Sequence, residues 1–91
     1  MLRVAIVGTG SISPRHIDGY LEFPDRCKIV ALVDIYPEKA QEKKERFGLA
    51  DAEVFDDHKK MLAREDIDIV DICTPPYVHA EIAINSLNAG K

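Results

Sequence analysis

The sequence has few of the features that would place it in an oxidising compartment, in a membrane or on nucleic acid. Its 91 residues contain only two cysteines, Cys27 and Cys73, each beside an apolar run, so we expect two reduced thiols in a cytoplasmic protein. The first apolar run, residues 4–7, is too short for a signal-peptide core or a membrane span, and no other run is long enough. Lys and Arg number 12 against 16 Asp and Glu, with no basic stripe, which argues against nucleic-acid binding.

Metal-binding spacings, repeats and linkers are missing too. No Cys-x-x-Cys or His-x-x-x-His pattern occurs, so the spacing predicts no metal site. The length fits one small domain. Short apolar runs alternate with helical patterns, which predicts an α/β fold: a Rossmann-type doubly wound parallel sheet of four strands in the order 3-2-1-4, with helices on both faces. The predicted strands are residues 2–7, 28–33, 53–55 and 67–73.

Helix signals fill the intervals between these strands. Ser13 and Pro14 are typical of an N-cap and a first helical residue, and Pro37 begins a second helix that ends near Gly48. Asp56 or Asp57 caps a short third helix. The last helix ends at Gly90, and its apolar face is predicted from four residues at helical spacing: Ala80, Ala83, Ile84 and Leu87.

The turn after the first strand carries the central motif, Gly8-x-Gly10-x-x-Ser13. Gly8 permits a sharp turn out of the strand, and Gly10 lets the backbone approach a pyrophosphate. The helix that opens near Ser13 directs unpaired N–H groups and a partial positive charge at that anion. Asp34 ends the second strand, 21 positions after Ser13, where a carboxylate accepts hydrogen bonds from the adenosine ribose. A tight structural turn with an ordinary helix cap, and an Asp34 that only caps its own turn, are the alternatives.

Two further observations concern the cofactor site. Asp34 is followed by Ile35 and Tyr36, with no adjacent Lys or Arg to meet a 2′-phosphate, so we expect NAD rather than NADP. The segment Thr74-Pro75-Pro76-Tyr77-x-His79 follows the fourth strand and is expected to form a wall of the site, with Thr74 and His79 as polar contacts. A stiff strand-to-helix connection is the alternative.

Taken together, these segments resemble the N-terminal domain of the Gfo/Idh/MocA oxidoreductases, the relatives of glucose–fructose oxidoreductase and inositol dehydrogenase. The resemblance covers essentially all 91 residues, and the Thr-Pro-Pro-x-x-His segment is its more specific part. It implies an NAD(P)-dependent oxidation or reduction of a carbinol carbon on a sugar, cyclitol or related molecule, in a protein that we expect to be a homo-oligomer. The residues that it implies for cofactor binding are Gly8, Thr9, Gly10, Ser11, Ile12, Ser13, Asp34, Thr74, Pro75, Pro76 and His79.

The catalytic part of such an enzyme lies beyond these residues. The family's catalytic lysine belongs to a Glu-Lys-Pro motif on the next strand, so Lys91 is not that residue. The resemblance therefore implies that residues 1–91 are a truncated dinucleotide-binding domain, without a catalytic residue and inactive alone. Without a fifth strand, the apolar fourth strand is a sheet edge, and we expect the isolated 91 residues to self-associate through it.

Two other functions stay open at this stage. The first is a non-catalytic module that binds or senses a dinucleotide, which a DNA-binding segment or a stop codon after residue 91 would favour. The second is another Rossmann enzyme, such as a reductase of an amino-acid pathway, against which the Thr74–His79 segment argues. His16 is expected to be a neutral packing or capping residue rather than a catalytic one. Asp71, inside an apolar strand, has no explanation from the sequence.

Overall fold

The structure is a computed structural model that describes residues 1–91 except for the side chain of Pro76. Its four strands form one parallel sheet in the order β3-β2-β1-β4, which confirms the predicted topology. The strands are β1 Leu2–Val7, β2 Cys27–Val33, β3 Glu53–Phe55 and β4 Ile69–Ile72, and the helices are α1 Ser13–Leu21, α2 Pro37–Arg46, α3 His58–Leu62 and α4 Pro76–Asn88.

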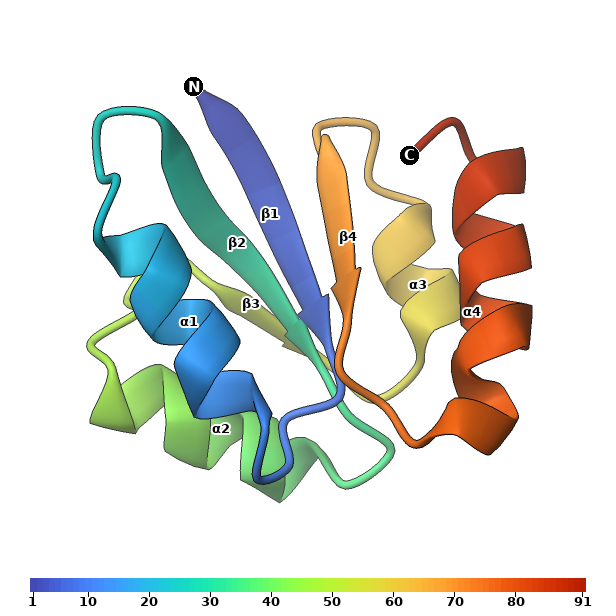
Figure 1. The fold of residues 1–91 in the computed structure, drawn as a ribbon, viewed down its shortest axis with the longest axis horizontal. Helices are drawn as coiled ribbons and strands as arrows, with labels where there is room; N and C mark the ends of the chain where they lie inside the picture. The colour runs from blue at the N-terminus through green and yellow to red at the C-terminus, as the bar shows by residue number, and fades with distance from the viewer.

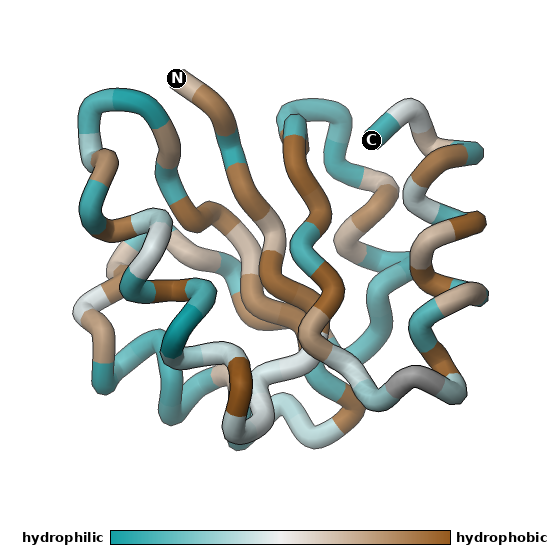
Figure 2. Tube along the Cα trace, viewed as in Figure 1, coloured by the Kyte–Doolittle hydropathy of each residue, from teal (hydrophilic) through white to brown (hydrophobic). Residues whose placement is uncertain are grey.

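Helices cover both faces of the sheet. Figure 1 shows α1 and α2 on one side of the strands and α3 and α4 on the other. Two apolar clusters correspond to these two layers. Ile17 and Ala40 pack on one face with apolar residues of β1 and β2, while Met61 and Ile82 pack on the other. The central strands are buried on both faces, which explains why β1 and β2 are almost continuously apolar rather than alternating (Figure 2).

The fourth strand is shorter than predicted. It spans Ile69–Ile72 rather than 67–73, because the residues on either side of this range form no ladder pair with β1. The N–H of Asp68 donates to the carbonyl of Arg3, and the N–H of Cys73 donates to the carbonyl of Val7. Among the strands that the structure describes, β4 has a neighbour on one side only.

The predicted apolar face of the last helix is wrong. Among the side chains of α4 that the structure describes, Ile82 and Ser86 are the buried ones, whereas Ile84 and Leu87 are 57% and 72% exposed. The helix presents a stripe at i, i+4 spacing to the sheet and to α3, and the Ser86 hydroxyl donates to the Ile82 carbonyl. A periodicity count cannot distinguish this stripe from its neighbour, because both contain apolar side chains. None of the helices, over the residues that the structure describes, is both long and apolar enough to cross a bilayer.

Candidate dinucleotide-binding site

Three loops meet at the carboxyl edge of the sheet. They follow β1, β2 and β4, and together with the first turns of α1 and α4 they contain every residue that the sequence predicts for the cofactor site. Figure 1 shows all three at the same end of the parallel strands. In a doubly wound sheet, this edge is where ligands bind.

Gly8 begins the first of these loops in a conformation that other residues rarely adopt. Its φ is +93°, and a Cβ added there would lie 2.9 Å from the carbonyl carbon of Cys73 and 3.0 Å from Cγ2 of Thr74. The loop after β1 and the loop after β4 therefore pack backbone against backbone at this point. Only glycine permits both the turn and the contact.

The three residues that follow Thr9 carry free N–H groups. Among the residues that the structure describes, the N–H groups of Gly10, Ser11 and Ile12 have no protein acceptor. They precede α1, whose first turn contains no acidic residue, and a Cβ on Gly10 would meet nothing within 4 Å. Unpaired N–H groups, a positive helix end and open space are the features that an anion-binding site requires.

Ser13 has a different role from the predicted N-cap. The helix begins at Ser13 itself and is preceded by Ile12, without a side-chain cap. The Ser13 side chain is fully buried, and its hydroxyl donates to the carbonyl of Gly10 at 2.8 Å. This hydrogen bond therefore fixes the shape of the glycine loop from its buried side. Ser11 and Ile12, just before the helix, are exposed.

Asp34 is held in place by the glycine loop. Its Oδ2 accepts hydrogen bonds from the N–H and the hydroxyl of Thr9, at 2.9 and 2.8 Å, and its Oδ1 accepts one from the N–H of Tyr36 at 2.8 Å. A carboxylate offers about four lone-pair positions, so Oδ1 can still accept one more bond. Asp34 does cap its own turn, as the alternative proposed, and it keeps acceptor capacity for a ligand. Thr9 is buried, and both of its donors are used on Asp34.

A cleft of about 590 Å³ lies between the glycine loop and α2. Thr9, Gly10 and Ser11 line one side, and charged side chains of α2 line the other. No cation is adjacent to Asp34 in the sequence, yet Lys39 lines this cleft, with its ammonium 5.0 Å from the centre of the Tyr36 ring. A larger set of charges thus faces the cleft from α2: Glu38, Lys39, Glu42, Lys43 and Arg46.

The segment after β4 contains a buried polar atom, in the side chain of Thr74, that matters for the site. The hydroxyl oxygen of Thr74 is buried without a hydrogen-bond partner among the described residues. An unsatisfied buried hydroxyl costs about 1–3 kcal/mol, so a partner from outside the chain, a water molecule or a ligand, is expected. Pro75 and His79 are exposed at the start of α4, and the predicted contact of the Pro76 side chain lies outside the described residues.

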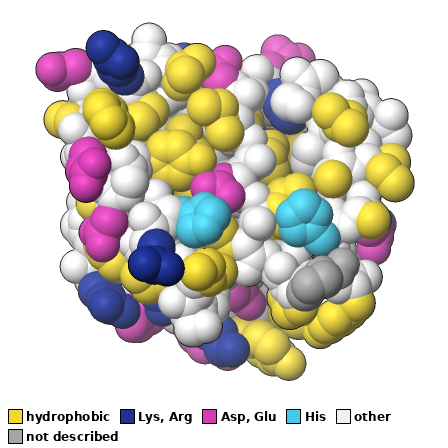
Figure 3. Space-filling view, in the orientation of Figure 1, with side chains coloured by type: hydrophobic (Ala, Val, Ile, Leu, Met, Phe, Trp, Pro, Cys, Tyr) yellow, Lys and Arg dark blue, Asp and Glu magenta, His cyan; other side chains and the backbone are white. Residues whose placement is uncertain are grey.

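A cluster that the sequence did not predict joins α1 to β4. Nδ1 of His16 lies 2.8 Å from Oδ2 of Asp71, the Tyr20 hydroxyl donates to the same oxygen at 2.8 Å, and Sγ of Cys73 lies 3.7 Å from Oδ1. Burial, and then the hydrogen bond to Asp71, raise the pKa of Tyr20 well above its usual value. Burial, and then the charge of Asp71, raise the pKa of the Cys73 thiol to about 12. Figure 3 shows two histidines on this face, one of them against an acidic side chain.

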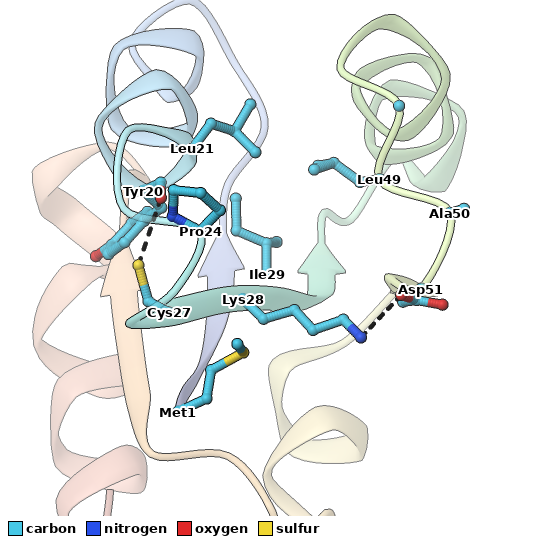
Figure 4. A pocket seen from close by; sticks show the side chains of 11 residues that line it. Met1, Tyr20, Leu21, Pro24, Cys27, Lys28, Ile29, Leu49, Ala50 and Asp51 are labelled. Carbon is cyan, nitrogen blue, oxygen red and sulfur yellow. Dashed lines mark hydrogen bonds and ion pairs between the residues drawn. The ribbon is translucent and has the colours of Figure 1, made fainter.

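A separate hollow of about 370 Å³ lies at the opposite, amino-terminal edge of the sheet (Figure 4). It lies between α1 and the segment after α2, with Leu21, Ile29 and Leu49 around it. The ion pair between Lys28 and Asp51, at 2.8 Å, crosses its rim. None of the predicted cofactor residues lines it.

The comparisons with known proteins agree with this geometry. The family model of GFO_IDH_MocA, the oxidoreductase family with an NAD-binding Rossmann fold, matches residues 2–91. The chain belongs to this family. It is 38% identical over 90 residues to 4-carboxy-2-hydroxymuconate-6-semialdehyde dehydrogenase of Sphingobium sp., a match that covers 99% of this chain and 28% of that protein.

Two solved structures of the family have the same fold. The WlbA dehydrogenase from Bordetella pertussis, in complex with NADH and UDP-GlcNAcA, has a TM-score of 0.89 and 32% identity, over 99% of this chain and 27% of its own. The myo-inositol dehydrogenase from Lactobacillus casei, in complex with NAD(H) and myo-inositol, has a TM-score of 0.89 and 28% identity, over 97% of this chain and 26% of its own. This chain therefore spans about a quarter of the length of the relatives that it matches.

Proposed function

We propose that residues 1–91 hold NAD(H) for an enzyme that transfers a hydride between the nicotinamide and a carbinol carbon of a sugar, cyclitol or related molecule. The observation that carries the proposal is the set of free N–H groups at Gly10, Ser11 and Ile12, which open α1 beside an Asp34 fixed by the glycine loop. Dehydrogenase relatives support the same function, and none of the comparisons favours a non-catalytic module.

The residues present fit a dinucleotide. The free N–H groups would bind the pyrophosphate, Oδ1 of Asp34 would accept a hydrogen bond from the adenosine ribose, and the orphaned Thr74 hydroxyl would bond the nicotinamide half. When bound, the nicotinamide supplies the hydride acceptor or donor. The chain's own contribution is to bind and orient it between the loops that follow β1 and β4.

The choice of cofactor depends on Asp34. The resemblance covers users of both NAD and NADP, so the preference must come from this chain's charges. A 2′-phosphate beside the Asp34 carboxylate costs on the order of a few kcal/mol at an effective dielectric constant of about 20. Lys39 offsets part of this repulsion, since it lines the same cleft, but it stands over the Tyr36 ring rather than against Asp34. NAD is therefore the preferred cofactor.

The whole enzyme is expected to act in the cytoplasm as a homo-oligomer. The two cysteines are free, which suits a reducing compartment. The substrate class is supported by the inositol and sugar-nucleotide ligands of two relatives, while the semialdehyde dehydrogenase widens the range to be tested.

The test is a dehydrogenase assay of the full-length protein with NAD and panels of cyclitols, sugars and sugar nucleotides, with aldehydes as a separate panel. We expect NADH formation with at least one carbinol substrate and none without NAD. Tight NAD binding without turnover on any panel would favour the non-catalytic module. Turnover confined to aldehydes would refute the substrate class.

A further inference from the structure

Asp71 is a largely buried carboxylate without a lysine or arginine partner. Its side chain is 16% exposed, and His16 is the only basic group within ion-pair distance among the described residues. Three groups instead converge on it: an imidazole nitrogen, a phenol and a thiol. A buried anion that gathers proton donors is an environment in which a cation can replace the protons.

The groups around Asp71 are also suitable metal ligands. The ligand atoms of His16, Asp71 and Cys73 all lie within 4.8 Å of one another. Nδ1 of His16 is 2.8 Å from one carboxylate oxygen, and Sγ of Cys73 is 3.7 Å from the other. In a tetrahedral zinc site, the usual bond lengths place neighbouring ligand atoms roughly 3.4 to 3.6 Å apart. The separations found here bracket that range, so small side-chain rotations suffice.

We propose that His16, Asp71 and Cys73 form a site for a divalent transition-metal ion, with Zn²⁺ as the best fit. The thiolate and the imidazole select zinc over magnesium or calcium, which prefer oxygen ligands. Solvent completes the fourth position. Tyr20 keeps its hydrogen bond to Asp71 and orients that carboxylate from outside the coordination sphere.

The protonation balance of the site is simple. Zinc displaces the thiol proton of Cys73 to solvent, and His16 binds through Nδ1 with its proton on Nε2. The thiolate and the carboxylate of Asp71 then neutralise the two positive charges of the ion. Because the ligands come from α1 and from the end of β4, the ion ties these two segments together.

The ion can reach the site without passing through the dinucleotide cleft. A separate surface hollow of about 450 Å³ is lined by His16, Tyr20 and Asp71. None of the free N–H groups of the glycine loop lines this hollow. The proposal therefore does not depend on the proposed function, and the two can fail separately.

The test uses the full-length protein, kept reduced with a phosphine, and two metal probes. Equilibrium dialysis is expected to show that the wild type binds one equivalent of Zn²⁺. In Cys73→Ser and in His16→Asn this binding should be lost or at least roughly tenfold weaker. Losing a direct ligand should reduce the metal affinity at least as much as losing an outer-shell partner does. Cys27→Ser is the matched control and should bind as the wild type does. Co²⁺ should give a thiolate-to-cobalt absorption band in the wild type and in Cys27→Ser, and none in Cys73→Ser.

A measurement on the wild type keeps the test independent of whether the variants fold. Over a labelling time long enough to alkylate Cys73 in the metal-free protein, Zn²⁺ should protect Cys73 from iodoacetamide while Cys27 is alkylated at an unchanged rate, as mapped by peptide mass spectrometry. Equal alkylation of Cys73 with and without Zn²⁺, or no cobalt–thiolate band, would overturn the proposal. Zinc binding that survives in Cys73→Ser and disappears in Cys27→Ser would also overturn it.

Discussion

Asp34 is the residue whose surroundings say most about the cofactor. Its position after β2 could be predicted from its spacing to the glycine motif. Its hydrogen bonds to Thr9 could not, because they depend on how the loop after β1 folds back over the end of β2. The structure thus shows a carboxylate that is positioned by two hydrogen bonds from Thr9 and whose Oδ1 can accept one more bond.

Replacing Asp34 with alanine should narrow the preference for NAD. The variant loses the repulsion toward a 2′-phosphate and the acceptor for the ribose, while Lys39 stays in the cleft. We expect the ratio of NAD to NADP affinity to fall at least about tenfold, which corresponds to roughly 1.4 kcal/mol. Titration of the full-length protein with both cofactors measures it. The double variant Asp34→Ala/Lys39→Ala should regain less NADP affinity, and an unchanged ratio in Asp34→Ala would contradict the assignment.

The two glycines of the motif should respond differently to the same substitution. Gly8→Ala places a methyl group against the Cys73 backbone at positive φ, so we expect a loss of about 1–3 kcal/mol in the free energy of unfolding. Gly10→Ala meets no protein atom and should change stability by less than about 0.5 kcal/mol. Chemical denaturation without cofactor measures both. Equal losses would show that the loop does not pack as described.

At the scale of elements, the loop from β4 to α4 carries an uncompensated hydroxyl. Thr74→Val keeps the shape of the side chain and removes the buried oxygen that lacks a partner. We expect the cofactor-free protein to gain about 1 kcal/mol in stability and to bind NAD more weakly by a similar free energy. Thermal melts with and without NAD measure both effects. Thr74→Ser, which keeps the hydroxyl, should retain NAD affinity, and a Thr74→Val variant that binds NAD normally would show that the hydroxyl does not contact the cofactor.

The junction between α1 and β4 should weaken in alkali. The folded state raises the pKa of Tyr20 above 10.0 and that of Cys73 from 9.0 to about 12. Both groups prefer to stay protonated in the folded chain, so their contribution is complete below the unfolded-state pKa values and is lost as the pH rises through the folded ones. We therefore expect the free energy of unfolding to fall from about pH 9 upward.

Variants separate this effect from general alkaline unfolding. Tyr20→Phe should be less stable at neutral pH, because it loses the bond to Asp71, but its stability should fall less steeply with pH. Tyr77 is 85% exposed, so Tyr77→Phe should follow the wild-type curve. Denaturation at a series of pH values gives the slopes. Parallel curves for the wild type and Tyr20→Phe would refute the role of Tyr20.

The elements themselves show where sequence patterns succeed. The apolar runs predicted β1 and β3 with their observed bounds. In β1 four consecutive residues are buried, and such a strand leaves a continuous apolar signal. The predicted apolar face of α4 and the prediction of Ser13 as an N-cap were wrong, since both depend on which neighbouring segment each helix contacts. The His16–Asp71 pair could not be predicted from the sequence either, because the two residues come together only when β4 pairs with β1.

The whole molecule places three sequence-distant loops at one edge. The order β3-β2-β1-β4 puts β1 in the middle, so the glycine loop lies between Asp34 on one side and Thr74 on the other. Neither Asp34 nor Thr74 alone, beside the glycine loop, would define a dinucleotide site. Under the proposed function, this order places the adenosine, the pyrophosphate and the nicotinamide one after another along the edge.

Calorimetric titration of the protein with NAD⁺, for the wild type and for Gly10→Ala, tests this account most directly. We predict a single binding event in the wild type and at least about tenfold weaker binding in Gly10→Ala, with the variant as stable as the wild type, because the added methyl group obstructs the approach of the pyrophosphate to the free N–H groups. No NAD binding by the wild type, or equal binding by a folded Gly10→Ala variant, would contradict the assignment of this edge as the dinucleotide site.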